Sequence, residues 1–166
     1  MSIARTLVDD FAHEAALTRK LLAAVPDDRL AWKPHDKSMT LGALAGHLAE
    51  TPGWCGAMLE PEFDFAASAA DWKPFVPASR KDLLDKHDHS ARAFGPLFAD
   101  RDDAFMKETW TMRNGATVML SEPRAAAARM FAIHHSIHHR GQLTVYLRLL
   151  GVPVPSTYGP SADDAG

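Results

Sequence analysis

The sequence has a single cysteine, Cys55, which excludes an internal disulfide bond. This composition fits a reducing cytoplasm, although it also suits a secreted protein that does not need disulfides. The first residues lack the apolar run of a signal peptide, and no stretch reaches the ~18 apolar residues of a membrane-spanning helix. These absences predict a soluble protein of the cytoplasm.

The chain also lacks an excess of positive charge. It has 18 lysines and arginines against 21 aspartates and glutamates, which gives a net charge of −3. It therefore offers neither the basic patch that binds nucleic acid nor the basic face of a helix lying on a membrane. At 166 residues it is long enough for one core and too short for two comfortable ones, so we expect a single domain over residues 1–166.

Motifs of several common enzyme classes are missing. The sequence has no glycine-rich phosphate loop, no Gly-x-Ser-x-Gly nucleophile turn and no His-Glu-x-x-His zinc motif. It also has no Glu-x-x-His unit, which di-iron carboxylate bundles use. Any chemistry must therefore come from another set of residues.

Histidine is the residue type that stands out, because four of the nine histidines lie between His134 and His139. Helical residues four apart lie on one face with Cβ atoms roughly 5–6 Å apart, so His134 pairs with His138 and His135 with His139. Helical phase, about 100° per residue, then places the second pair on the apolar stripe. Other residues of that stripe are Ala128, Phe131, Ala132, Gln142, Tyr146, Leu149 and Leu150.

The arginines at 129, 140 and 148 fall on the far side of this helix, where Met130, Ile133 and Ile137 also lie. That side is apolar enough to pack on another helix or to form a two-fold dimer contact. His135 and His139 are predicted to point at the core. A hydrogen-bonded core pair is the simpler interpretation of them, and a metal site would need a third ligand from elsewhere.

Hydrophobic periodicity predicts four amphipathic helices. We expect them over residues 2–24, from 41 to a break near Thr51 caused by Pro52, over 79–98, and over 121–150 with Ser121 as the N-cap. Ser38 or Thr40 caps the second helix. Because the connections differ greatly in length, the predicted fold class is all-α, a four-helix bundle with long connections.

Two connections carry further signals. Alternating apolar residues around Asn114-Gly115 indicate a short hairpin, after a solvated turn at residues 100–103. Residues 60–78 contain four aromatic side chains, which either wall a pocket or only roof the core. Gly141 interrupts the last helix and suggests close approach of a neighbouring backbone. Cys55 is expected to be a buried, inert thiol.

His47 is the best-placed third ligand. It shares a helical face with Ala43, Thr51, Trp54 and Met58, although a lone histidine on such a face is usually a satisfied core residue. With His135 and His139 it would form a three-histidine site that adds no negative charge and leaves a coordination position open. A water or a thiol entering that position would lose its proton more easily.

The ligand set does not fix the metal. Imidazoles suit Zn²⁺ and Ni²⁺, which we expect most, and also Fe²⁺, Mn²⁺ or Cu²⁺. Gln142 and Tyr146 share the stripe, so they are candidates to reach a bound ligand or to hold a water beside the site. Packing and local hydrogen bonding is the alternative role for both residues.

Three stretches resemble the DinB/YfiT-like metalloenzymes. They are Leu44-Ala45-Gly46-His47-Leu48-Ala49-Glu50, His135-Ser136-Ile137-His138-His139-Arg140-Gly141-Gln142-Leu143 and Tyr146 to Pro155; the tail from Tyr158 to Asp164 resembles one branch of the family. The resemblance covers nearly the whole chain, most clearly from Trp32 onward. It implies a four-helix bundle, usually a homodimer, with a divalent metal held by His47, His135 and His139.

The resemblance also implies a class of activity, because members with an assigned reaction are transferases or isomerases that use small thiols. Our first hypothesis is therefore a metal-dependent enzyme that activates a low-molecular-weight thiol toward a small electrophile, or else activates water. The second is a non-catalytic, metal-stabilised dimeric stress-response protein. The third is a structural histidine cluster that binds no metal.

Overall fold

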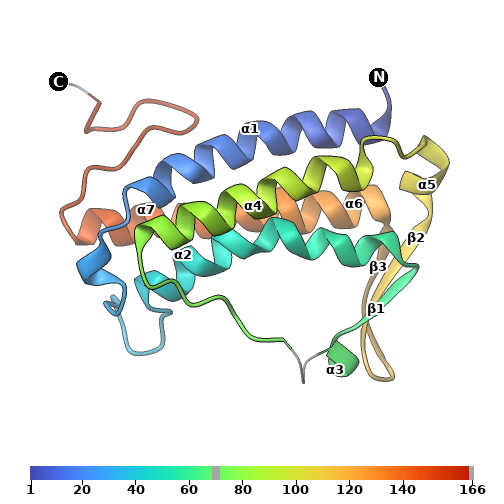
Figure 1. The fold of residues 1–166 in the computed structure, drawn as a ribbon, viewed down its shortest axis with the longest axis horizontal. Coiled ribbons are helices and arrows are strands. Elements are labelled where there is room, and N and C mark those ends of the chain that lie inside the picture. Colours follow the sequence, from blue (N-terminus) through green and yellow to red (C-terminus); the bar gives the residue numbers. More distant parts are fainter. Residues whose placement is uncertain (69–71, 165–166) are drawn as a thin grey trace.

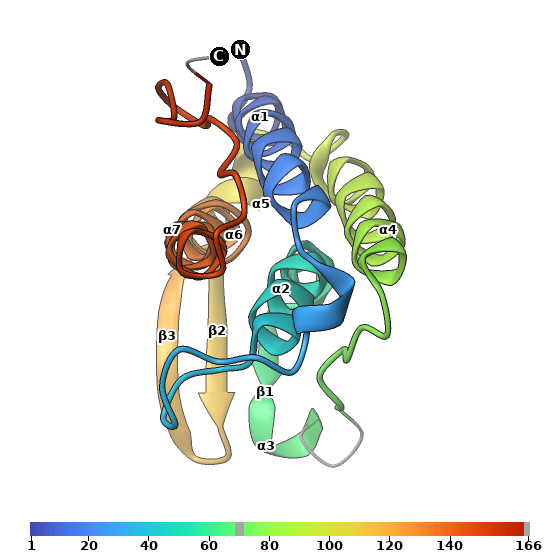
Figure 2. The same ribbon diagram turned by 90° about the vertical axis from the view of Figure 1, so that its left-hand side faces the viewer.

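The chain is mostly helical, and its long helices lie side by side. A computed structural model describes residues 1–68 and 72–164. Its long helices are α1 (Ile3–Ala23), α2 (Leu41–Glu50), α4 (Arg80–Phe98) and α7 (His135–Leu149). Seen end on in Figure 2, they surround a common centre. Among the described residues, no helix is both long and apolar enough to cross a lipid bilayer.

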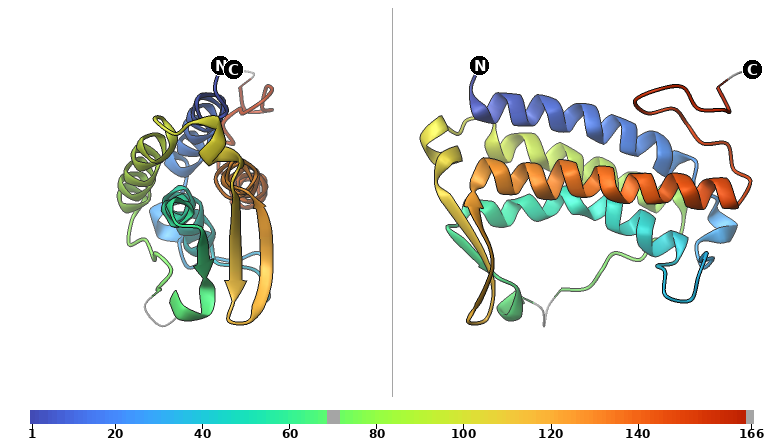
Figure 3. Two further views of the ribbon diagram at one scale, coloured as in Figure 1. Left: turned by 90° about the vertical axis from the view of Figure 1, so that its right-hand side faces the viewer. Right: turned by 180° about the vertical axis from the view of Figure 1, so that it is seen from behind.

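Two of these helices are extended by segments of another helical type. The 3-10 segment η2 (Thr51–Leu59) follows α2, and α6 (Arg124–Ala128) leads through the π-helical segment η3 (Arg129–His134) into α7. Figure 3 shows α6, η3 and α7 as one continuous rod. The predicted break near Thr51 is confirmed, because α2 ends one residue before it and Pro52 lies at the start of η2.

A small sheet contradicts the all-α prediction. It contains β1 (Glu62–Asp64), β2 (Thr109–Asn114) and β3 (Thr117–Pro123), in the order β1-β2-β3. The predicted hairpin is confirmed: β2 pairs antiparallel with β3, and Gly115 has the positive φ, +58°, that a tight hairpin turn favours. The parallel pairing of β1 with β2 was not predicted, because β1 has only three residues. The sheet lies at one end of the helices (Figure 1).

Serine and threonine side chains cap three of the long helices, and the cap predicted for the last helix was wrong. Side-chain oxygens of Ser2, Thr40 and Ser79 accept backbone hydrogen bonds at the starts of α1, α2 and α4. Ser121 does not cap a helix; it lies in β3 opposite Thr111, and the helix begins only at Arg124. The strand is longer than predicted because pairing with β2 satisfies its backbone as far as Pro123.

The remaining short elements are η1 (Asp27–Arg29), α3 (Phe65–Ser68) and α5 (Asp103–Lys107). The turn predicted at residues 100–103 is only half correct, since α5 begins at its last residue. Asp102 caps α5 by accepting a hydrogen bond from the Phe105 backbone N–H. This cap explains why an acidic turn also starts a helix.

Buried apolar side chains form two clusters, one toward each end of the long helices. Members of the first cluster include Leu7, Phe11, Phe94, Phe98 and Ile133. Members of the second include Leu21, Leu22, Leu83, Leu143 and Leu147. In the chain order of α1, α4 and η3–α7, buried polar residues fall between members of the two clusters. We call this set the polar layer: Glu14, Thr18, His87, Ser90, Ser136 and Arg140.

A buried ion pair forms the centre of the polar layer. Arg140 is only 2% exposed, and its Nη2 donates to Glu14 Oε2 at 2.6 Å. Its Nη1 donates to the Glu14 carbonyl at 3.0 Å and to the Thr18 hydroxyl at 3.3 Å. The Tyr158 hydroxyl lies 2.6 Å from both side chains, so the C-terminal tail is tied to α1 and α7.

The predicted core face of the last helix was wrong by one residue. The buried residues of α7 are Ser136, Arg140, Leu143 and Leu147. Helical phase from His135 assigned Arg140 to the far side of the helix, but the ion pair with Glu14 turns it into the core. His135 and His139 are therefore half-buried beside the core, and Leu149, expected inside, is 60% exposed.

The π-helical segment changes the phase upstream of α7. A π turn contains an additional residue, so side chains before it are rotated relative to a regular helix. The far side was predicted to pack on another helix or to form a dimer contact. Ile133 is buried in the first cluster and Ile137 packs against it, which agrees with the first alternative. Met130 remains largely exposed.

Two glycines have opposite roles. A Cβ at Gly46 would lie 2.6 Å from the Phe75 carbonyl oxygen and 3.1 Å from the Pro77 ring, so the loop before α4 crosses α2 at this residue. The prediction of a close backbone approach at Gly141 was wrong: it is exposed, and a Cβ there would meet nothing within 4 Å among the described residues. The close backbone approach is at Gly46, the residue before His47.

We expect Gly46→Ala to lower the free energy of unfolding by about 1–3 kcal/mol, because the new methyl group must displace a backbone carbonyl. Gly141→Ala is the matched control and should raise stability by up to about 1 kcal/mol, since alanine favours a helix and has room there. Denaturant unfolding measures both. Equal effects of the two substitutions would contradict this account of the loop contact.

Candidate metal centre

Three histidines from two distant segments converge at one point. The ring nitrogens of His47, on α2, and of His135 and His139, on α7, lie within 4.8 Å of one another. The Nε2 atoms of His47 and His135 are 2.7 Å apart, and the ring of His139 is centred 4.6 Å from that of His47. The structure thus brings together the three residues that the sequence singled out.

The two helices position these rings differently. His135 and His139 are one helical turn apart on α7, and each directly precedes a buried residue of the polar layer. His47 lies near the end of α2, where its carbonyl accepts a 2.6 Å hydrogen bond from the Thr51 hydroxyl. Because α2 packs on α7, the side of α7 beside the polar layer faces His47.

The electrostatics of the cluster favour neutral imidazoles. Burial, together with the neighbouring histidines, lowers the pKa of His47 and of His135 from 6.5 to about 4. Burial also lowers the pKa of His139, despite a hydrogen bond with Gln142 that raises it. At neutral pH these rings therefore carry lone pairs and no charge, which is the state in which histidine binds metals.

Gln142 is positioned to orient one of these rings. His139 Nδ1 lies 2.7 Å from Gln142 Oε1, and an amide oxygen only accepts, so the imidazole donates from Nδ1. The lone pair of His139 is then on Nε2. This is the arrangement in which a second residue fixes the tautomer of a metal-binding histidine. The contact is a local hydrogen bond within α7, which was the alternative role for Gln142.

Tyr146, the other proposed helper, has different contacts. Its hydroxyl donates to the Met39 carbonyl at 3.1 Å, and its ring lies edge-on to Trp32. These contacts attach the loop before α2 to α7, the packing role that was the alternative. His134 and His138 are exposed, as their place on the flank of the helix predicted.

Cys55 and Tyr158 lie in other surroundings. Cys55 is a fully buried member of the first apolar cluster, and burial raises the pKa of its thiol to about 12. It is inert, as expected, because the reactive form of cysteine is the thiolate. Tyr158 contacts Glu14 and Arg140, as described above.

A cavity of about 680 Å³ lies beside the histidines, and sequence analysis identified only part of it. Phe63, Phe65 and Trp72 from the aromatic loop line it, which confirms the pocket-wall interpretation for three of the four rings. Phe75 instead packs against the second apolar cluster. Trp110 and Met112 also line the cavity, which the sequence did not predict. The alternation of apolar residues in the predicted hairpin was the feature that could have identified them.

Acid should destabilise the metal-free protein between pH 6.5 and about 4. Unfolded histidines take up protons near pH 6.5, whereas folded His47 and His135 resist protonation until about pH 4. The unfolded state therefore binds more protons in this window, so stability falls as pH drops. In EDTA, from pH 7 to pH 5, we expect the wild type to lose several degrees more in Tm than a His47→Asn/His135→Asn double variant.

His13→Asn is the control for this experiment, because His13 is exposed on α1. This variant should show the same pH dependence as the wild type. A double variant that loses as much stability as the wild type would show that the cluster does not resist protonation.

Comparisons with known proteins agree on the family. The sequence model of the DinB family matches residues 1–165. The chain is 29% identical over 154 residues to YrdA of Bacillus subtilis (strain 168), an uncharacterized protein, and the match covers 91% of this chain and 85% of YrdA. Among solved structures, a DinB-like protein from Bacillus cereus ATCC 10987 superposes with a TM-score of 0.69 at 24% identity, covering 92% of this chain and 95% of that one.

A more distant structural neighbour is the mycothiol-dependent maleylpyruvate isomerase. It superposes with a TM-score of 0.54 at 13% identity, covering 86% of this chain and 63% of that one. Identity this low shows a shared fold and nothing more. The match over nearly the full length, together with the fold, establishes that this chain belongs to the DinB family.

Proposed function

We propose that the chain is a divalent-metal-dependent enzyme that activates a small thiol toward an electrophile. The observation that carries the proposal is the convergence of three neutral imidazoles, with ring nitrogens within 4.8 Å of one another. Three nitrogen ligands on two packed helices match catalytic sites in which the protein leaves one position to water or substrate.

The donor atoms present fit such an ion. His47, His135 and His139 would hold it, and Gln142 would keep the His139 ring in the tautomer that presents Nε2. A bound divalent cation supplies Lewis acidity, which favours the thiolate over the thiol at neutral pH. Because all three ligands are neutral, they would not cancel the formal positive charge of the ion.

The reaction we propose is addition. The thiol adds its sulfur and its proton across a polarised double bond of the electrophile, so atoms and electrons balance without another reactant. If the thiol is later eliminated from the same carbon, the outcome is isomerisation. If it stays, the outcome is S-transfer.

Two observations support a thiol over water. One is the fold shared with an isomerase whose name states that it depends on mycothiol. The other is that the cluster of possible ligands in the described residues contains histidines only. A metal hydrolase commonly adds a carboxylate as general base, as the glutamate of His-Glu-x-x-His does.

We propose Zn²⁺ or Ni²⁺ as the resident ion, since an all-imidazole set suits both, with Fe²⁺ and Mn²⁺ as weaker candidates. We also class the helical layer of α1, α2 with η2, α4, and α6 to α7 as a four-helix bundle. The end-on arrangement of these helices in Figure 2 supports this class.

We further propose that the protein works as a homodimer in the cytoplasm. Met130, Val145 and Leu149 are exposed apolar residues along η3 and α7, and Val145 and Leu149 lie one helical turn apart. Such a stripe suits pairing with the same stripe of a second copy. A single buried thiol suits a reducing compartment.

A second candidate function is a non-catalytic protein in which the metal only joins α2 to α7, as in a stress-response protein stabilised by its ion. The position of His47 on one helix and of the other two ligands on its neighbour favours this candidate. Both candidates predict that chelation lowers Tm, since an ion held at 1,000 times its Kd adds about 4 kcal/mol of stability. Only the first candidate predicts catalytic activity.

We expect His135→Ala to abolish stoichiometric metal content and thiol-conjugating activity, because two imidazoles are too few for a tight site. His134→Ala is the matched control: it removes an exposed histidine next to His135 and should change neither quantity. Elemental analysis of protein purified without a nickel column measures the metal. A panel of small thiols with unsaturated electrophiles measures the activity.

The outcomes separate the candidates. Unchanged metal content in His135→Ala would refute the site itself. Metal binding and a large chelation effect on Tm, without activity for any pair in the panel, would favour the non-catalytic protein.

A further inference from the structure

The cavity lined by Trp54 is apolar and is built from several parts of the chain. Its walls come from η2, β1, α3, Trp72, the β2–β3 hairpin and η3. The lining residues with aromatic rings are Trp54, Phe63, Phe65, Trp72, Trp110 and Phe131. A volume of about 680 Å³ is within the usual range of sites for small organic molecules.

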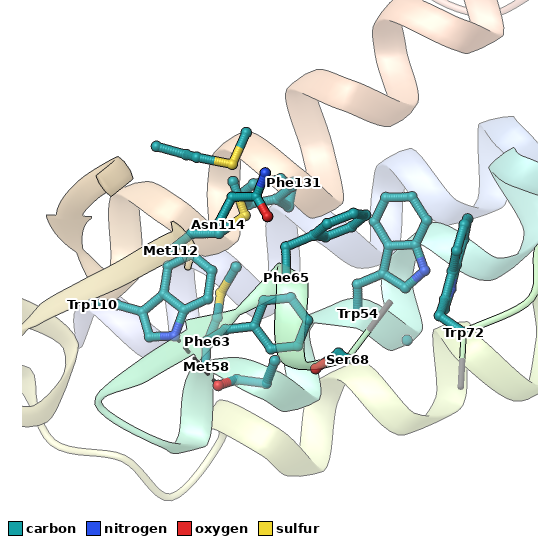
Figure 4. A pocket seen from close by; sticks show the side chains of 13 residues that line it. Trp54, Met58, Phe63, Phe65, Ser68, Trp72, Trp110, Met112, Asn114 and Phe131 are labelled. Carbon is teal, nitrogen blue, oxygen red and sulfur yellow. Dashed lines mark hydrogen bonds between the residues drawn. The ribbon is translucent and has the colours of Figure 1, made fainter. Parts of the chain in front are cut away.

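Trp54 connects this cavity to the histidine cluster. Its ring lies edge-on to His47, with centroids 5.0 Å apart, and 5.9 Å from the centroid of His135. The same ring lines the cavity, next to Trp72 at a centroid distance of 6.5 Å. Figure 4 shows these two rings at one side of the cavity and Trp110 at the other. Trp54 is therefore both a wall of the cavity and a neighbour of the histidine cluster.

The cavity offers almost no partner for a charged group. No charged side chain is among its described lining residues, and the polar side chains are those of Ser68 and Asn114 together with the indole nitrogens. The Trp110 indole N–H already donates to the Ala57 carbonyl. Arg113 lies on β2 between Met112 and Asn114, does not line the cavity and pairs with Glu62. Moving a carboxylate into these surroundings would cost several kcal/mol without compensation.

We propose that this cavity binds the second substrate, and that this substrate is an uncharged, largely aromatic small molecule. Aromatic rings pair edge-to-face or offset with one another, so a wall of six rings favours a flat aromatic guest over a flexible chain. The inference rests on the proposed function only in calling the guest a substrate. The cavity and its selectivity for neutral molecules are properties of the chain without metal.

The test compares two dyes with the same ring framework. Phenylnaphthylamine is neutral, and anilinonaphthalenesulfonate carries one sulfonate. With the EDTA-treated full-length chain, we expect the neutral dye to bind at one site with energy transfer from the lining tryptophans. Its Kd should be at least about tenfold lower than that of the sulfonate. Chlorodinitrobenzene, a neutral aromatic electrophile, should displace it, whereas maleate, a dianionic one, should not.

A pair of neighbouring variants supplies the control. Met119 lines the cavity at an irregularity of the β2–β3 pairing, and Val118 beside it does not. The two side chains are 57% and 55% exposed, so arginine at either residue should leave the fold intact, which circular dichroism checks. Met119→Arg should weaken binding of the neutral dye about tenfold and strengthen binding of the sulfonate, whereas Val118→Arg should change neither affinity.

The inference is overturned if the neutral dye does not bind, if both dyes bind equally, or if the two variants behave alike. It is also overturned if dye binding weakens as protein concentration rises, because a second copy of the chain would then cover the cavity. His135→Ala should bind the dye like the wild type. In the wild-type protein, absence of dye binding with stoichiometric metal content would therefore refute the substrate class alone. Absence of metal with intact dye binding would refute the proposed function alone.

Discussion

The ion pair of Arg140 with Glu14 is the constraint on which the arrangement of the helices depends. Both side chains are buried between two apolar clusters, where an unpaired charge would be very unfavourable. The guanidinium donates to the Glu14 carboxylate, the Glu14 carbonyl and the Thr18 hydroxyl, so only one rotation and one height of α7 against α1 satisfy it. Apolar contacts alone would tolerate sliding of one helix along the other, whereas the hydrogen bonds of the polar layer would be broken by it.

This constraint also places the proposed ligands. His139 directly precedes Arg140, and His135 directly precedes the buried Ser136, so fixing α7 against α1 turns both imidazoles toward α2. On α2, the loop that crosses Gly46 donates the Phe75 N–H to Glu50, which holds the segment carrying His47 between loop and helix. The site is therefore positioned by packing on both sides. Burial favours the neutral form of all three imidazoles, which lowers the repulsion between the converging rings.

The sequence predicted the residues of the site better than their surroundings. Spacing identifies His135 and His139, and the apolar stripe identifies His47, because both signals are local to one helix. The inward turn of Arg140 could not be predicted, since it depends on Glu14, 126 residues away in the chain. Nor could the β1 pairing, which joins a strand of three residues to a distant hairpin. The prediction of Ser121 as an N-cap failed for a similar reason, because pairing of β3 with β2 took precedence over a local helix signal.

The burial of Cys55 has a consequence for the proposed thiol chemistry. Cellular thiols and their oxidised forms exchange with exposed cysteines, and an enzyme with an accessible thiolate would be trapped in mixed disulfides. Here the only sulfhydryl is sealed inside an apolar cluster with a pKa of about 12, and no other cysteine exists in the chain. Thiols and electrophiles that reach the surface of this fold would thus meet no accessible cysteine with which to form a covalent bond.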